Sequence, residues 1–309
     1  MIKTSEKLNR RSRPKSYSIA LQIMALSGIV CLILFNYLPM FGIFIAFQDY
    51  TLAGGFLDSP FVGLHHFRTF LNDPIFFRAV RNTLIITGLT IAIGFPLPIL
   101  LALILNELPF RRFRTAVQTV SYFPHFIAYV VVAGLWLNLL DTRGLVNNFL
   151  MSWELIDRPI FFWAEVHWYR PLVILVHVWK ETGWGAIIYV AAIAGINPEL
   201  YEAAKIDGAS RLRQIRHVTL PGIAGTIVVM LILAMGGLVR GNLDQSMLFG
   251  NVFNRSVSYI IEHYVLDLGF GTMRYSFAAA IGLMQSIFAL ILVLGANRLA
   301  RVVSGRSII

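Results

Sequence analysis

A series of long apolar segments, separated by shorter polar stretches, constrains this chain more than any other feature. An α-helix needs about 20 consecutive apolar residues to cross the hydrocarbon core of a bilayer, which is about 30 Å thick. Six segments meet this requirement, at about residues 18–47, 83–105, 115–140, 171–196, 221–243 and 276–302. The sequence therefore predicts an all-α integral membrane protein with six transmembrane helices.

The composition agrees with a membrane protein. Hydrophobic residues make up 57% of the chain and charged residues 14%, whereas a soluble domain has about 25% charged residues. No polar stretch is long enough to bury a core of its own. We therefore expect one transmembrane domain over residues 18–303, with tails at 1–17 and 304–309. Proline removes a helical donor and clashes with the preceding turn, so Pro39, near Asn36, predicts a break in the first segment; Pro124 lies inside the third.

Basic residues predict the orientation. With the N-terminus inside, the inner segments carry sixteen Lys and Arg residues and the outer segments nine. Acidic residues are distributed the other way, five inside and ten outside. Cytoplasmic loops generally carry the excess of Lys and Arg. The first apolar segment is longer than the core of a cleavable signal, about 7–15 residues. We expect it to be retained, with both termini in the cytoplasm.

The net charge of +10 does not indicate a nucleic-acid partner. Most basic residues flank the apolar segments, and no basic stripe with interleaved aromatic residues lies outside them. Cys31 is the single cysteine and lies in the first apolar segment. A disulfide within the chain and a cysteine metal cluster are therefore excluded.

A polar, amphipathic insert interrupts the apolar pattern at residues 197–221. Asn197, Pro198 and Glu199 are typical of a helix start, because they supply a cap, a proline in the first turn and an acid near the positive end of the helix dipole. This helix should run to about Ile206 and end at Asp207-Gly208, where glycine favours the left-handed turn. Ser210 can cap a second helix to about Val218, and Pro221 should start the fifth span. Composition alone leaves open whether this insert is a lipid-surface loop or a docking surface.

The insert resembles the EAA loop of the permeases of binding-protein-dependent ABC importers, and residues 197–221 are called the EAA loop below. The matching residues are Glu202, Ala203, Ala204, Asp207, Gly208, Ala209, Leu220 and Pro221. Residues 36–50, 61–71, 179–196 and 275–301 are similar to a subgroup of carbohydrate permeases. Gly225 departs from the pattern, since many relatives have a second proline there.

The resemblance implies the type I importer permease fold, with the EAA loop forming coupling helices that sit in a cleft of a cytoplasmic ATPase. It implies a homologous second permease, two ABC ATPase subunits and an external solute-binding protein as partners, in a bacterial cytoplasmic membrane. ATP and Mg would bind the ATPase subunits, and no cofactor is expected in this chain. The subgroup implies that the solute is an oligosaccharide or a polysaccharide fragment.

Motifs for enzymatic activity are absent from the sequence. A phosphate-binding P-loop needs glycine directly before its lysine, and none of the five lysines follows glycine. The chain also has no HExxH, no GxSxG and no Cys/His cluster. His65-His66 is an isolated pair in an outer segment, typical of a surface position rather than a metal site. We therefore expect no enzyme activity and no metal in this chain.

Polar residues inside or beside the apolar segments are the candidates for the solute path. Lys180 and Glu181 are adjacent in the fourth segment, where charges usually face a cavity or a partner. They should point about 100° apart on a helix and have different partners. A purely structural pairing is the alternative. The full set of candidates, in which the tryptophans would stack on sugar rings, is Trp179, Lys180, Glu181, Trp184, Asn242, Asp244, Gln245 and Gln285.

Other functions remain open on the sequence alone. The chain could be an importer permease for another small solute, or an ion-coupled secondary transporter. The latter usually has inverted repeats with charged sites in broken helices, and no internal repeat is visible here. A membrane scaffold would keep the insert as a docking platform without a solute path.

Overall fold

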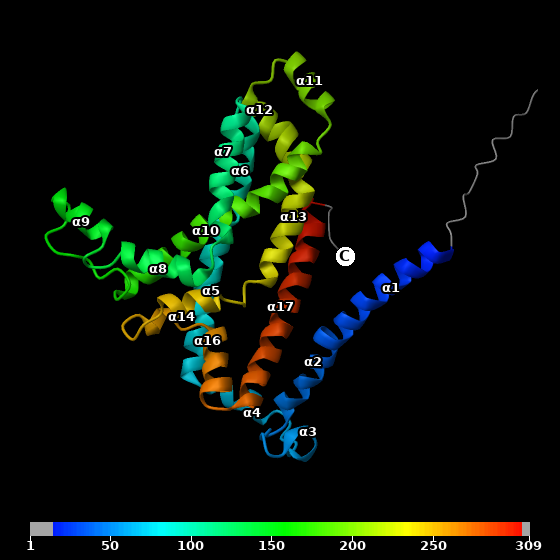
Figure 1. Cartoon of the computed structure of the whole chain (residues 1–309), viewed down its shortest axis with the longest axis vertical. Helices are drawn as coiled ribbons and strands as arrows, with labels where there is room; N and C mark the ends of the chain where they lie inside the picture. The colour runs from blue at the N-terminus through cyan, green and yellow to red at the C-terminus, as the bar shows by residue number, and fades with distance from the viewer. Residues whose placement is uncertain (1–14, 305–309) are drawn as a thin grey trace, which may run out of the picture.

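The computed structural model describes residues 15–304, and within this range the chain is built of helices, with one isolated bridge between Gln48 and Phe61. The predicted tails, at 1–17 and 304–309, therefore lie almost entirely outside the described residues. α11 lies at one end of the molecule and α3 and α4 at the other, with the long helices running between them (Figure 1). The predicted all-α architecture is confirmed.

The first predicted span is an uninterrupted helix of changing type. It comprises α1 (Lys15–Leu32), the π-helix η1 (Ile33–Tyr37), α2 (Leu38–Met40) and the 3₁₀-helix η2 (Phe41–Phe47). The predicted break at Asn36 and Pro39 is therefore a change of helix type. The π turn includes Phe35, whose carbonyl lies four residues before Pro39, and its wider winding makes room for the proline ring. This helix leans away from the other helices (Figure 1). In its most apolar 18-residue stretch, 6% of the residues are buried.

The second span begins at Pro74 rather than near Thr83. α5 (Pro74–Gly94) and α6 (Pro96–Glu107) form one helix of 34 residues. The Asp73 side chain caps it by accepting a hydrogen bond from Ile75 N at 2.8 Å. The predicted start was late because Arg78, Arg81 and Asn82 make the first turns polar. Two short helices, α3 (Gly55–Asp58) and α4 (His65–Phe70), precede it.

The third predicted span is not a single straight helix, which corrects the expectation for residues 115–140. α7 (Arg111–Tyr122) and the 3₁₀ turn η3 (Phe123–Phe126) meet α8 (Tyr129–Leu139) at a bend of 101°. Pro124 lies in this turn, and Ile127 has an extended backbone. The helix cannot continue there, because proline lacks the N–H donor and its ring obstructs the preceding turn. α9 (Leu145–Ser152) extends the molecule outward beyond α8 (Figure 1).

The fourth span, α10 (Val166–Ala194), is 29 residues long and begins before Pro171. Pro171 lies in the second turn of this helix, where it removes the N–H that would pair with the His167 carbonyl, and the helix continues through it. The fifth predicted span, 221–243, is shifted. α12 (Arg211–Gln214), the π-helix η4 (Ile215–Thr219) and α13 (Leu220–Gly236) form one helix that ends at Gly236. The sixth, α17 (Tyr275–Ser304), lies where it was expected.

Between α13 and α17 the chain forms four short helices. They are α14 (Leu243–Phe249), α15 (Arg255–Ser258), α16 (Ile261–Leu266) and the π-helix η5 (Asp267–Gly271). α14 packs on α8, and α16 packs on α5 and α17. This segment therefore belongs to the body of the molecule and is not a free outer loop.

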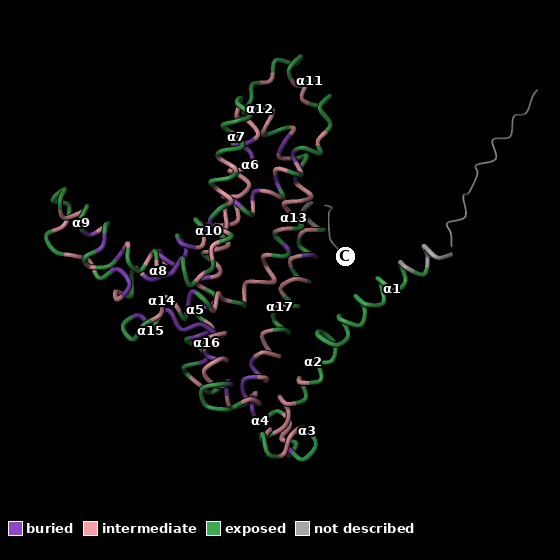
Figure 2. The backbone as a smooth tube through the Cα atoms, viewed as in Figure 1, coloured by how far each residue is buried: buried purple, intermediate pink, exposed green. Residues whose placement is uncertain are grey.

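Four helices within residues 15–304 are long and apolar enough to cross a membrane, and the bent α7–α8 pair would be a fifth. The remaining predicted span, the fourth, corresponds to α10, which is long enough but is not among these helices. Its centre contains Lys180 and Glu181, which lower its apolar character. Buried residues concentrate where α5, α8, α10 and α16 meet, whereas α1 and α11 are exposed (Figure 2).

Candidate functional site: the EAA loop and a polar groove

The EAA loop forms the helix and turn expected from its sequence. α11 (Pro198–Ile206) begins after Asn197, whose side-chain oxygen accepts a hydrogen bond from Glu199 N at 3.1 Å. It ends at Asp207, and Gly208 has a φ of +72°, a left-handed conformation that glycine adopts at least cost. Ala209 N then donates to the Ala204 carbonyl at 2.9 Å. The predicted helix and its glycine turn are confirmed.

The loop presents its side chains outward. No residue of α11 is buried. Glu202 and Ala203 are exposed, and Ile206 is 87% exposed. A short helix that keeps apolar and acidic side chains unburied at one end of the molecule is suited to contact another protein.

Two contacts hold the parts of the loop together, and a third joins the loop to α6. Tyr201 Oη lies 2.9 Å from Thr219 Oγ1, and Gln214 Nε2 donates to the Ala209 carbonyl at 2.9 Å. Arg211 Nη1 lies 3.6 Å from Glu107 Oε2 at the end of α6. These contacts make the loop part of the helical body.

The second helix of the loop differs from its prediction. Ser210 makes no side-chain capping bond, and the helix does not end at Val218. It continues through Leu220 and Pro221 into α13, because the π-helix η4 widens the backbone just before the proline. The second half of the loop and the fifth span therefore form one continuous helix.

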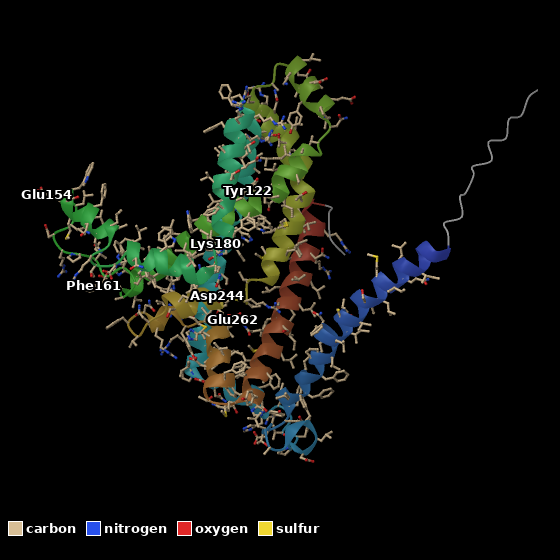
Figure 3. The ribbon with its side chains drawn as sticks, viewed as in Figure 1. Tyr122, Glu154, Phe161, Lys180, Asp244 and Glu262 are labelled. Atoms are coloured by element: carbon tan, nitrogen blue, oxygen red, sulfur yellow. The ribbon has the colours of Figure 1, made fainter. Side chains whose placement is uncertain are left out.

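A polar groove runs along α5, α10 and α13. It consists of two adjoining hollows of about 450 and 370 Å³ that share Thr90, Ile91, His177 and Ala234. Glu181 and Trp184 line the hollow nearer the EAA loop, and Asn242, Asp244 and Gln245 line the other. Lys180 and Asp244 are labelled near the centre of the molecule (Figure 3). Five of the eight predicted solute-path residues thus lie along one groove.

Glu181 and Trp184 form a cluster with the bend of the third span. Glu181 Oε2 lies 2.8 Å from His125 Nδ1. The His125 ring stacks on Trp184, with ring centroids 4.4 Å apart and an interplanar angle of 3°. Trp184 is 44% exposed, so one part of the indole stays accessible. The cluster offers an aromatic surface beside a carboxylate.

Lys180 does not line the groove. It is 4% exposed, and its Nζ donates to the carbonyls of Pro124 at 3.3 Å and His125 at 2.5 Å. The same amine lies 3.7 Å from Glu181 Oε1. The expected separate partners are therefore wrong, because Lys180 and Glu181 both bind His125 of η3 and lie close to each other. Lys180 supplies a donor to the His125 carbonyl, at the point where the helix is broken.

Trp179, Gln285 and Gln245 also have structural contacts. Trp179 packs edge-on against Trp136 at 5.9 Å and does not line the groove. Gln285 Nε2 donates to the Val239 carbonyl at 3.1 Å, outside the groove. Gln245 lines the groove but is 5% exposed, and its Nε2 donates to the Val173 carbonyl at 3.0 Å. Asp244 is the exposed acid of this hollow.

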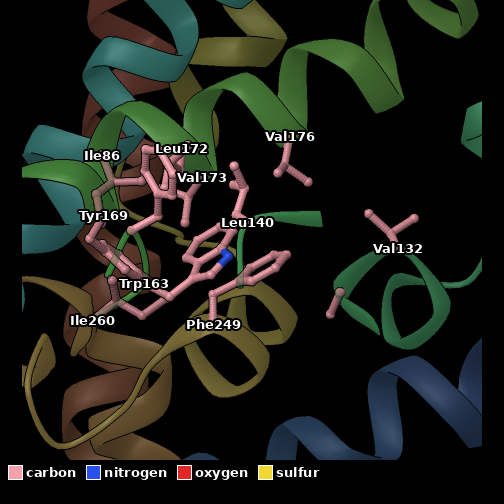
Figure 4. Packing of buried hydrophobic residues seen from close by; sticks show 12 residues of the cluster. Ile86, Val132, Leu140, Trp163, Tyr169, Leu172, Val173, Val176, Phe249 and Ile260 are labelled. Carbon is pink, nitrogen blue, oxygen red and sulfur yellow. The ribbon is translucent and has the colours of Figure 1, made fainter. Parts of the chain in front are cut away.

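A packed aromatic cluster supports the hollow that Asn242 and Asp244 line. Trp163 and Phe249 stack with ring centroids 4.4 Å apart, next to Val173 and Ile260 (Figure 4). Because Phe249 belongs to α14 and Trp163 lies just before α10, this stack holds α14 on the segment that leads into α10. Asn242 caps α14 by accepting a hydrogen bond from Gln245 N at 3.0 Å. Asp244, in the first turn of α14, is therefore held in place.

Sequence reasoning missed several groove residues, namely Thr87, Thr90, His177 and Arg240. His177 lies four residues before Glu181, on the same face of α10, and this spacing could have identified it. Thr87 and Thr90 resemble ordinary polar residues within an apolar helix. Arg240 was counted only as an outer basic residue, because nothing in its local sequence separates it from the others.

Comparison with known proteins gives a consistent result. The family model described as "Binding-protein-dependent transport system inner membrane component" matches residues 94–307. The polygalacturonan/rhamnogalacturonan transport system permease protein YteP of Bacillus subtilis (strain 168) is 45% identical, with 91% of this chain and 87% of YteP covered. Protein LplB of the same organism is 40% identical, with 91% and 88% covered.

Solved structures are similar over nearly the whole chain. One is a chain from a bacterial ABC transporter that imports the acidic polysaccharide alginate, with a TM-score of 0.85 and 39% identity. It covers 94% of this chain and 97% of the other. A second is from the alginate transporter in complex with an alginate pentasaccharide-bound periplasmic protein, with a TM-score of 0.85 and 38% identity, covering 95% and 98%.

Proposed function

Because this chain belongs to the inner membrane components of binding-protein-dependent transport systems, we propose that it is the permease subunit that carries a sugar through an ATP-driven importer in a bacterial cytoplasmic membrane. One observation carries the proposal most strongly. The EAA loop is exposed at one end of the molecule and is continuous with α13, a helix that lines the polar groove. A movement applied at the loop can therefore change the groove.

The solute in this proposal is an oligosaccharide or polysaccharide fragment that carries carboxylates. The names of the alginate and polygalacturonan relatives support this class. The groove supports it as well, because Arg240 can pair with a carboxylate and Trp184 offers a ring face to a sugar. Both contacts are open to solvent on one side, which allows release.

The proposed assembly contains a second permease, two ABC ATPases and an external solute-binding protein. The alginate transporter bound to its periplasmic protein supports the last of these. In this arrangement α11 sits in a cleft of one ATPase on the cytoplasmic side, and both termini are cytoplasmic. ATP and Mg bind the ATPase subunits, whose closure pushes α11. Rigid coupling of a short helix to a span is a common means of transmitting such a movement.

The test is reconstitution of the four-component complex in vesicles, with labelled oligosaccharide and binding protein outside. Wild type should take up solute only with ATP. Gly208→Asp forces a residue with a Cβ into a left-handed turn next to the ATPase surface, and should abolish both uptake and solute-stimulated ATP hydrolysis. Gly55→Asp is the control, since Gly55 also has a positive φ, of +58°, but lies at the opposite end. Uptake that persists without the ATPases would favour an ion-coupled transporter instead.

A further inference from the structure

The α5–α10 helix pair has a second groove, which adjoins the first at Val178. It has a volume of about 370 Å³ and is lined by Leu89 and Ile93 of α5 and by Leu175 and Val178 of α10, among other apolar residues. The single charged residue in its lining is Arg170. The polar groove takes Thr87, Thr90 and His177 from the same helices. The second groove therefore lacks the polar side chains that these helices contribute to the first.

The apolar groove lies open at the surface. Leu89 is 42% exposed, Ile93 47% and Leu175 49%. In a protein that spans a membrane, such a surface faces hydrocarbon or another helix. Its lining offers no hydrogen-bond partner for a sugar along its length, so a hydrated solute would lose its water contacts there without replacement.

Arg170 lies at the end of this groove with unused donors. Its Nη2 donates to Asn82 Oδ1 at 3.0 Å, and Asn82 is held in turn by the carbonyls of Ser256 and Tyr259. Its Nε is buried and has no hydrogen-bond partner among residues 15–304. The guanidinium is thus oriented by an amide while part of its hydrogen-bonding capacity is free.

The charge of Arg170 is also uncompensated. In the described part of the chain no carboxylate forms an ion pair with it. Arg81 of α5, an exposed residue outside the groove lining, is a like charge that repels it. A guanidinium without an acid attracts an anion, and a phosphate can accept two parallel hydrogen bonds from it.

The depth of Arg170 matches a lipid headgroup. It precedes Ala194, the last residue of α10 before the EAA loop, by 24 positions. At about 1.5 Å per residue this is about 36 Å along the helix, slightly more than the hydrocarbon thickness of about 30 Å. With the EAA loop on the cytoplasmic side, Arg170 reaches the outer headgroup layer and the apolar groove runs inward from it.

We propose that this groove binds one anionic glycerophospholipid of the outer leaflet, with its phosphate on Arg170 and Arg81 and an acyl chain along Leu89, Ile93, Leu175 and Val178. The lipid would stabilise the contact between α5 and α10, which also line the polar groove. The proposal does not depend on which solute is carried. A free phosphate ion would satisfy the arginines but leave the apolar groove unfilled, and this difference can be measured.

The experiment uses the assembled importer, purified in detergent and supplied with phosphatidylglycerol or with neutral phosphatidylcholine. Native mass spectrometry counts retained lipid, and inorganic phosphate is added as a competitor. Wild type should retain phosphatidylglycerol selectively, and phosphate should not displace it. Arg170→Gln should reduce this retention about tenfold or more, as expected for losing a charge-assisted contact. Arg170→Lys, which keeps the charge, should restore part of it.

Arg143→Gln is the matched control, because Arg143 is exposed and lies outside the groove. Arg170→Gln also loses its bond to the buried Asn82 Oδ1 and should melt below wild type in phosphatidylcholine. Phosphatidylglycerol should then raise the melting temperature of wild type but not that of the variant, which separates lost lipid binding from misfolding. Equal retention of the two lipids by wild type would overturn the proposal. So would unchanged retention in Arg170→Gln, displacement by phosphate alone, or burial of Leu89 and Leu175 against the second permease.

Discussion

At the scale of single residues, Lys180 shows how a charge can be retained inside a membrane protein. Its amine donates to the carbonyls of Pro124 and His125 at the bend of the third span. An intramembrane charge therefore has a structural role here, as in one of the two interpretations that the sequence left open. The groove takes its polar character from the neighbouring Glu181 instead.

Replacing Lys180 with methionine should destabilise the assembled importer. The substitution keeps the length of the side chain but removes the donor to the His125 carbonyl, at a cost of about 1–3 kcal/mol for an unpaired buried group. Thermal unfolding of the purified complex should show a lower melting temperature. Lys205→Met, on the exposed face of α11, should leave the melting temperature unchanged. An equally stable Lys180→Met variant would contradict the assigned role.

Gly183→Ala should disrupt the contact between α10 and α7. An added Cβ would overlap the backbone carbonyl of Ser121, which cannot move without shifting α7. Overpacking of this kind costs about 1–3 kcal/mol, so the variant should assemble in smaller amounts and melt at lower temperature. Gly88→Ala is the matched control, since nothing lies within 4 Å of its added Cβ. Similar behaviour of the two variants would argue against close packing at Gly183.

At the scale of elements, two proline-containing helices use the same solution. Pro39 and Pro221 each follow a π-helical turn, η1 or η4, which lets the helix pass the proline without stopping. Pro124 has a 3₁₀ turn instead, and there the chain bends by 101°. A π-helical turn precedes the proline at these two positions, and η4 thereby connects the EAA loop to α13.

Tyr201→Phe should weaken coupling between α11 and η4. The substitution removes only the hydroxyl that lies 2.9 Å from Thr219 Oγ1, a bond worth about 0.5–1.5 kcal/mol. We expect ATP hydrolysis to continue while solute transported per ATP hydrolysed falls. Both rates can be measured in the same vesicles. Thr219→Val should give the same defect, and the double variant should be no worse; additive losses would exclude a shared bond.

At the scale of the whole molecule, the two ends of the long helices carry different chemistry. One end has α11, an exposed helix with acidic and basic residues. The opposite end has α3 and α4, beside the aromatic cluster of Phe70, Phe76 and Phe277. The predicted orientation places α11 in the cytoplasm.

Cysteine labelling should test this orientation. Cys31 is first replaced by alanine, because it is exposed and would react as well. Ile206→Cys, at a position 87% exposed, should then react with an impermeant maleimide only from the cytoplasmic side. Leu57→Cys, at a position 95% exposed, should react only from outside. Labelling of Ile206→Cys in intact cells would contradict both the orientation and the proposed ATPase contact.

The sequence by itself determined the helical class, the positions of the first and last spans, and the helix and glycine turn of the EAA loop. These features depend on local properties, namely apolar length, capping side chains and the conformational freedom of Gly208. Only the tertiary structure decided that Pro124 bends its span whereas Pro221 does not, that Lys180 is enclosed, and that His177 and Arg240 share a groove with Asp244. Such contacts join residues far apart in the chain, and burial and partners depend on packing that no local pattern records.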